Sequence, residues 1–144
     1  MVHPPNFYKV KVGRVNKYLY CFTMSKKILF VEDDNNLVQS LKGVAKQEGF
    51  QFISAFDGER GAELAKKEEP DLILLDLILP KKSGFDVLKE IKANEKLAKI
   101  PIIILTNLED GKDLEKALSL GANTYLVKTN YSMEEVMRKI KELL

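Results

Sequence analysis

The residues best suited to chemistry in this sequence are acids, a hydroxyl and a lysine that directly follow short apolar runs. They are Glu32, Asp33 and Asp34 after residues 28–31, Asp76 after residues 72–75, Thr106 after residues 102–105, and Lys128 after residues 125–127. Each has an ordinary explanation when taken alone, because acids after a strand often form turns or cap the next helix, and a threonine or lysine there can simply be structural or solvated. Together they offer several carboxylate oxygens and one cation.

Asp76 is the hardest of these residues to explain structurally. It lies within the apolar segment 72–79, where an unpaired carboxylate would cost several kcal/mol of desolvation. Lys128 could supply a compensating cation, and a divalent metal would supply a larger one. Glu32, Asp33 and Asp76 form the oxygen-rich set that Mg²⁺ prefers. Because three converging acids repel one another, both cations would relieve that repulsion.

The rare residues exclude other chemistries. His3 is the only histidine and Cys21 the only cysteine, so residues 24–144 contain neither imidazole nor thiol. A zinc site of nitrogen and sulfur ligands is excluded there, as is a Ser-His or Cys-His nucleophile pair. A lone cysteine cannot form an internal disulfide, which fits a reducing cytoplasm. The longest uncharged stretch, residues 117–127, is too short to span a bilayer as a helix.

The order of apolar patterns predicts which elements position these residues. Strands are expected at 28–31, 51–55, 72–75, 102–105 and 125–127. Helices are expected at 35–48, 59–68, about 85–91, 112–120 and from residue 132 onward, where Ser132 and Glu135 have capping-box spacing. Strands that alternate with helices predict a parallel sheet between two helical layers. Ligands bind beyond the carboxyl ends of such strands, where the candidate residues stand.

Charge is distributed unevenly along the chain. The first 23 residues hold Lys9, Lys11, Arg14 and Lys17 and no acid, whereas the rest has 19 basic against 21 acidic residues. The net positive charge of the sequence therefore comes from residues 1–23, and direct nucleic-acid binding by the domain is not expected. We interpret residues 1–23 as an N-terminal extension outside the domain, or a start placed too far upstream, and residues 24–144 as the domain. An additional β-element in the extension is left open.

Four segments, 28–34, 74–80 with Gly84, 101–106 and 121–128, resemble the motifs of response regulator receiver domains in two-component signal transduction. They fall in that family's order and at its intervals, and the resemblance covers residues 26–143. It implies an α/β fold, a flavodoxin-like (βα)5 doubly wound sandwich with a five-stranded parallel sheet of order 2-1-3-4-5.

The resemblance also implies a phosphoryl-transfer site. Asp76 matches the phosphoacceptor, which takes a phosphoryl group from a sensor histidine kinase or a phosphotransfer protein. Asp33 and Asp76 would bind Mg²⁺ directly, Glu32 through water, and Ile78 through its backbone carbonyl.

Two further positions match the family's phosphate-binding and switch residues. Lys128 and Thr106 would contact the phosphoryl group. Thr106 and Tyr125 would act as the switch; a half-buried strand aromatic is the less favoured alternative for Tyr125. Phosphorylation would remodel a surface of the fourth helix, fifth strand and last helix, so the chain would be a phosphoacceptor switch rather than an ordinary turnover enzyme.

The expected partners follow from the same resemblance. They are the kinase or phosphotransfer protein and an unidentified downstream protein, with a homodimer through the fourth helix, fifth strand and last helix also open. No membrane contact and no direct nucleic-acid contact are expected, and the expected location is the cytoplasm. The chain would be a stand-alone receiver, or a piece of a longer regulator.

Four residues depart from the family's usual pattern. Thr129 follows the lysine where proline is common, and Asn107 follows Thr106 where a small residue is common. Ile78 and Leu108 are apolar at positions two beyond Asp76 and Thr106, so neither can orient an attacking water. Slow loss of the phosphoryl group is therefore predicted.

Three other interpretations compete with a working receiver. A haloacid-dehalogenase-like phosphatase would need a second acid where Ile78 stands, to donate a proton. A flavodoxin-like cofactor binder would need a phosphate loop where this chain has three acids, which repel phosphate unless a cation intervenes. A pseudo-receiver would keep the fold as a phosphorylation-independent docking module; the intact acids, Thr106 and Lys128 argue against it, and Thr129 and Asn107 keep it open.

Overall fold

The computed structural model of the protein describes residues 7–11, 13–14, 18–22 and 25–144. Strands β1 (Phe7–Lys11) and β2 (Tyr18–Phe22) form an antiparallel two-stranded sheet of their own, within the segment interpreted above as an N-terminal extension. Their register pairs Phe7 with Phe22 and Lys11 with Tyr18. This segment therefore contains the additional β-element that the sequence left open. The boundary predicted between residues 23 and 24 lies outside the described residues.

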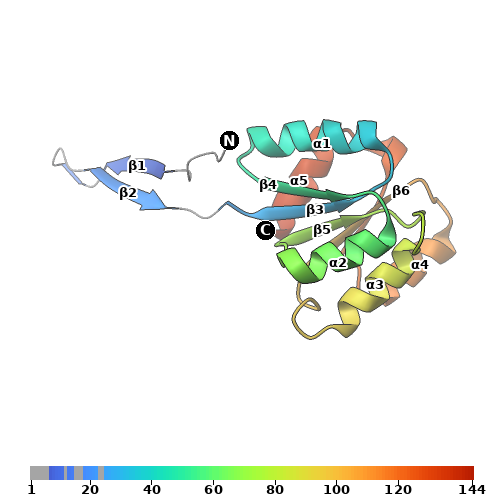
Figure 1. Cartoon of the computed structure of the whole chain (residues 1–144). Helices are drawn as coiled ribbons and strands as arrows, with labels where there is room; N and C mark the ends of the chain where they lie inside the picture. The colour runs from blue at the N-terminus through green and yellow to red at the C-terminus, as the bar shows by residue number, and fades with distance from the viewer. Residues whose placement is uncertain (1–6, 12, 15–17, 23–24) are drawn as a thin grey trace.

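The second sheet has five strands, all parallel, and carries the candidate site. The strands are β3 (Lys27–Val31), β4 (Gln51–Ala55), β5 (Leu72–Leu75), β6 (Ile102–Thr106) and β7 (Thr124–Val127). Their order across the sheet is β4-β3-β5-β6-β7 (Figure 1). Counted along this sheet alone, that order is 2-1-3-4-5, which confirms the predicted doubly wound fold.

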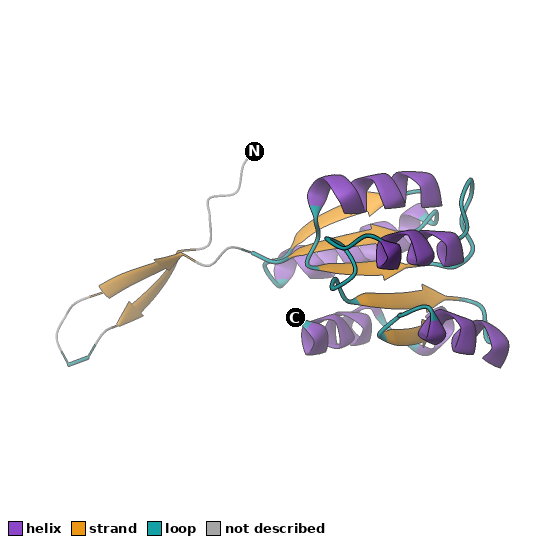
Figure 2. Cartoon of the chain, turned by 90° about the horizontal axis from the view of Figure 1, so that it is seen from below, coloured by secondary structure: helices purple, strands orange, loops and turns teal. Residues whose placement is uncertain are grey.

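Five α-helices cover the two faces of this sheet. They are α1 (Asn35–Gln47), α2 (Gly58–Glu68), α3 (Gly84–Ala93), α4 (Gly111–Ser119) and α5 (Met133–Leu143). Helices α1 and α5 lie on one face, and α2, α3 and α4 on the other (Figures 1 and 2). An Asp or Ser side chain caps the N-terminus of each helix, which satisfies backbone N–H groups that have no partner within the helix. Ser132 and Glu135 form the predicted capping box.

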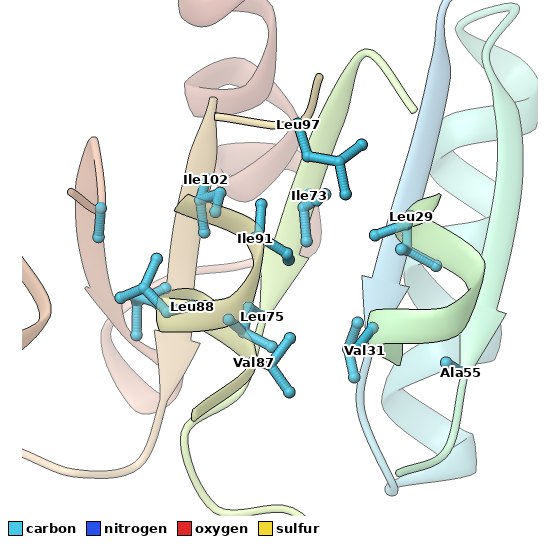
Figure 3. Packing of buried hydrophobic residues seen from close by; sticks show 14 of the residues in the cluster. Leu29, Val31, Ala55, Ile73, Leu75, Val87, Leu88, Ile91, Leu97 and Ile102 are labelled. Carbon is cyan, nitrogen blue, oxygen red and sulfur yellow. The ribbon is translucent and has the colours of Figure 1, made fainter. Parts of the chain in front are cut away.

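Two apolar clusters, one on each face of the sheet, hold these layers together. The side chains of β5 are buried along its full length, as expected for a strand covered on both sides. On the α2–α3–α4 side, Leu88 and Ile91 of α3 pack over Ile73 and Leu75 (Figure 3). On the other side, α1 and α5 bury a second cluster that includes Phe30. Among the described residues, no helix combines the length and apolar character needed to cross a membrane.

Candidate functional site

The candidate acids lie together because their strands are neighbours that run in the same direction. β3 and β5 pair in parallel, and Glu32 and Asp76 directly follow their last residues. The Asp76 N–H donates to Val31 O at 3.1 Å, and the Glu32 N–H donates to Ala55 O at 2.9 Å. These hydrogen bonds extend the sheet pairing by one residue. The backbones of Glu32 and Asp76 are therefore fixed at the carboxyl ends of β3 and β5.

Glu32, Asp33 and Asp76 form a compact group of carboxylates. One oxygen atom from each lies within 4.8 Å of the others. Glu32 is fully buried and Asp76 is 4% exposed, whereas Asp33 is exposed. The group therefore has two buried oxygen donors and one that opens to solvent, which fits a hard cation that keeps some of its water.

Lys128 supplies a positive charge within this group. It begins the short 3₁₀ helix η1 (Lys128–Asn130), directly after β7, so its side chain reaches past the end of β6. Its Nζ donates to Asp76 Oδ2 at 2.8 Å and forms an ion pair with Glu32 Oε1. Burial alone would lower the pKa of Lys128, but the bonds to Asp76 and Glu32 outweigh it and raise the pKa above its ordinary value. The ammonium therefore stays charged at neutral pH.

The negative charge of the buried Glu32 carboxylate is only partly compensated by Lys128. Its Oε2 accepts the Asp33 N–H at 3.1 Å. Its buried Oε1 faces Lys128 but accepts no hydrogen bond of good geometry within the described part of the chain. Burial, together with the nearby charge of Asp76, raises the pKa of Glu32 to about 7, although Lys128 opposes the shift. Glu32 and Asp76 share Lys128, and Asp33 adds a third carboxylate, so a divalent cation would balance the remaining negative charge. The residues present therefore fit Mg²⁺.

Two neighbours of the acids have different surroundings. Asp34 caps α1, because its Oδ1 accepts the N–H groups of Asn36 and Leu37. The helix-capping explanation therefore holds for Asp34, the last acid of the run 32–34. Ile78 donates its N–H to Asp76 Oδ1 at 3.3 Å, while its side chain is 58% exposed. The role predicted for its carbonyl stays a prediction.

Thr106 ends β6, the strand next to β5, and Tyr125 lies in β7, the strand next to β6. Thr106 is fully buried, and its Oγ1 accepts the Leu108 N–H at the long distance of 3.5 Å. The half-buried Tyr125 donates its hydroxyl to Leu108 O at 2.8 Å. Burial raises the pKa of Tyr125, so this hydroxyl keeps its proton at neutral pH. The loop after β6 is therefore bonded to both predicted switch residues through Leu108.

Comparison with known proteins identifies the family. Residues 28–141 match the family model described as the response regulator receiver domain. The chain belongs to the response regulator receiver family. This receiver domain is 37% identical over 121 residues to the alkaline phosphatase synthesis transcriptional regulatory protein PhoP of Bacillus subtilis. That match covers 84% of this chain and 49% of PhoP, so the chain spans about half the length of the curated relatives it matches.

Solved receiver domains have the same fold as this one. The receiver domain of the Francisella response regulator 1452 superposes with a TM-score of 0.76 at 27% identity, covering 83% of this chain and 96% of that one. The receiver domain of the sensor histidine kinase PA1611 from Pseudomonas aeruginosa has a TM-score of 0.75 at 29% identity, covering 83% and 98%. The latter structure carries a magnesium ion coordinated in its active site cleft.

The packing of the loop after Asp76, residues 77–83, could not be predicted from the sequence. A Cβ atom at Gly84 would lie 2.1 Å from Asp76 O, so only glycine fits there. A Cβ atom at Gly58, the first residue of α2, would lie 1.9 Å from Lys82 O. The sequence shows both glycines beside ordinary turn residues, and nothing in their spacing distinguishes a close approach from a flexible turn.

Proposed function

We propose that this chain is a phosphorylation-controlled switch in which Asp76 accepts a phosphoryl group from a sensor histidine kinase or phosphotransfer protein, with Mg²⁺ bound. The observation that carries the proposal is a cluster of three carboxylates, of which Asp76 and Glu32 contact Lys128; the Lys128 Nζ lies 2.8 Å from Asp76 Oδ2. The proposed setting is the cytoplasm, in keeping with a chain whose one cysteine cannot form an internal disulfide.

Asp76 is the nucleophile in this proposal. One of its carboxylate oxygens attacks the phosphorus of a phosphohistidine, an O–P bond forms as the N–P bond breaks, and the imidazole nitrogen leaves with the electron pair. The product on this chain is an acyl phosphate. The Ile78 N–H and the Lys128 ammonium fix the orientation of the carboxylate before the donor arrives.

The neighbours of Asp76 would carry the charge of the reaction. Asp33 and Asp76 would hold Mg²⁺ directly, with Glu32 acting through water and Ile78 through its carbonyl. When bound, Mg²⁺ neutralises negative charge on the transferring phosphoryl oxygens. Lys128 is held in place to contact the same oxygens, since it already bonds the attacking carboxylate. Positioning and electrostatic stabilisation together account for the catalysis.

The switch would act through the loop after β6. A phosphoryl group on Asp76 would offer acceptor oxygens to Thr106, whose hydroxyl has, among the residues that the structure describes, only the 3.5 Å contact with Leu108 N–H. Movement of Thr106 would shift Leu108, and Tyr125 with it, because Tyr125 bonds the Leu108 carbonyl. The affected surface is that of α4, β7 and α5, where a downstream protein or a second copy would bind.

The chemical nature of the product tests this function. After incubation with Mg²⁺ and phosphoramidate, a small phosphodonor with an N–P bond, the protein should carry phosphoryl that hydroxylamine removes completely. An acyl phosphate reacts with hydroxylamine, whereas a phosphoserine or phosphothreonine does not. Phosphoryl that survives hydroxylamine would contradict the proposal.

We expect the phosphoryl group to be lost slowly. Ile78 and Leu108 carry no side-chain group that can position an attacking water. Replacing Ile78 with asparagine should shorten the half-life several-fold, while Ile78→Val should leave it unchanged. Intact mass, followed after removal of the donor, measures both. A wild-type half-life as short as that of fast-cycling chemotaxis regulators would contradict this prediction.

A further inference from the structure

We propose that Gly58 is a positioning residue for the loop that follows Asp76, and that its lack of a side chain maintains the affinity of the site for Mg²⁺. This inference rests on the proposed function, since it concerns the same metal site. The loop comprises residues 77–83 and is called the metal-site loop below. Gly58 lies outside it, at the first position of α2.

The start of α2 and the metal-site loop touch through their backbones. The Gly58 N–H donates to Pro80 O at 3.2 Å. A Cβ atom at position 58 would lie 1.9 Å from Lys82 O and 2.7 Å from Lys82 C. Both atoms belong to the main chain, so no side-chain rotation could relieve the contact. An alanine at this position would therefore separate the helix from the loop.

The helix side of this contact has little room to move. Asp57 caps α2 by accepting the Arg60 N–H at 2.7 Å. One turn further on, Gly61 packs against Val31, because a Cβ there would lie 2.6 Å from Val31 Cγ1. Val31 directly precedes Glu32 in the sheet. Retreat of α2 would thus break its packing against β3, so we expect the loop to move instead.

The metal-site loop is held by its own hydrogen bonds. A displacement of Lys82 should therefore be transmitted along the loop to the residues next to Asp76. The Lys82 N–H donates to Pro80 O at 2.8 Å, and Lys81 adopts a left-handed conformation with φ of +66°. At the other end, the Gly84 N–H donates to Leu77 O at 2.9 Å. Ile78 lies between these anchors and donates to Asp76 Oδ1. A shifted loop would move the Ile78 backbone relative to the carboxylates.

A matched control exists in α1. Glycine to alanine in a helix normally favours folding, because alanine loses less backbone entropy. Gly43 is such a position, since a Cβ atom placed there would have nothing within 4 Å. We therefore expect Gly43→Ala to raise stability and leave Mg²⁺ affinity unchanged. Gly58→Ala adds the same methyl group at a position where Lys82 O already occupies the space that the Cβ atom needs.

The experiment is calorimetric titration of Mg²⁺ into the full chain as wild type, Gly58→Ala and Gly43→Ala, with amide NMR spectra to establish that each is folded. Gly58→Ala should bind Mg²⁺ about tenfold more weakly or worse, the usual loss when support behind a metal ligand is removed. An unchanged dissociation constant in folded Gly58→Ala would overturn the inference. Failure of the wild type to bind Mg²⁺ would overturn the proposed metal-dependent function, and this inference with it.

Asp57 provides a second test if Gly58→Ala does not fold. Asp57→Ala removes the α2 cap and the Lys81 contact at 3.7 Å without adding an atom. Ser132→Ala removes an equivalent cap from α5, away from the metal-site loop. Both variants should lose stability, but only Asp57→Ala should weaken Mg²⁺ binding, by several-fold. Equal Mg²⁺ affinity in the two variants would show that α2 does not position the loop.

Discussion

Lys128→Met is expected to destabilise the folded protein by about 3–5 kcal/mol at pH 8 in the absence of Mg²⁺, the cost typical of removing one partner from a buried ion pair. Lys128 is the cation in contact with Glu32 and Asp76, whose side chains are 0% and 5% exposed. Methionine has a similar length, so packing is largely kept and the lost charge dominates. Urea unfolding monitored by circular dichroism measures the loss.

Lys66→Met is the matched control for this change. Lys66 also forms an ion pair, with Glu90 Oε1 at 2.6 Å, but their side chains are 49% and 31% exposed. Solvent screens such a pair, so its removal should cost less than about 1 kcal/mol. Equal losses for Lys66→Met and Lys128→Met would contradict the electrostatic account of the site.

The loss caused by Lys128→Met should depend on pH. The charge of Lys128 lowers the pKa of Glu32, so its removal raises that pKa further above about 7. A carboxyl whose pKa is higher in the folded state costs stability above its unfolded pKa, and the cost disappears as it takes up a proton. The destabilisation should therefore shrink as the pH falls from 8 toward the ordinary glutamate value of 4.5. Mg²⁺ should recover part of it at pH 8, because the ion binds only the folded site.

Leu88→Ala is expected to reduce the free energy of unfolding by about 2–5 kcal/mol, from lost apolar burial and the cavity left behind. Leu88 is fully buried between α3 and the sheet, within the cluster that includes Ile73 and Leu75 (Figure 3). The midpoint of urea unfolding should fall while the slope with denaturant stays constant, as for a change in stability alone.

Leu118→Ala makes the same substitution on the exposed side of α4. Leu118 is 43% exposed, so its truncation should change stability by no more than about 0.5 kcal/mol. A loss at Leu118 as large as that at Leu88 would mean that α4 packs more tightly than the structure shows.

The sheet could be predicted from the sequence because its three central strands, β3, β5 and β6, are buried on both faces. Runs such as 72–75 are continuously apolar, and the helices between them have clear caps and periodic apolar faces. The gathering of Glu32, Asp76 and Lys128 follows from the same pattern, since the carboxyl ends of parallel strands share one edge.

Other features depend on contacts between distant backbones, which leave little trace in the sequence. The role of Asp34 as a cap rather than a member of the acid group is decided by where α1 begins. The glycine contacts of the metal-site loop arise when α2 and α3 approach it from either side. The pairing of β1 with β2 could not be predicted either, because short runs such as 18–22 do not by themselves specify a partner strand or a register.

The central claim, that Asp76 accepts a phosphoryl group in a Mg²⁺-dependent reaction, is tested most directly by intact mass after incubation with acetyl phosphate. Wild type with Mg²⁺ should gain one phosphoryl group, whereas Asp76→Asn with Mg²⁺, and wild type with a chelator, should gain none. Asp86→Asn, which changes an acid in the first turn of α3, should behave as wild type. No gain in folded wild type that binds Mg²⁺ would contradict the account and favour a phosphorylation-independent docking module, and an equal gain in Asp76→Asn would place the acceptor elsewhere.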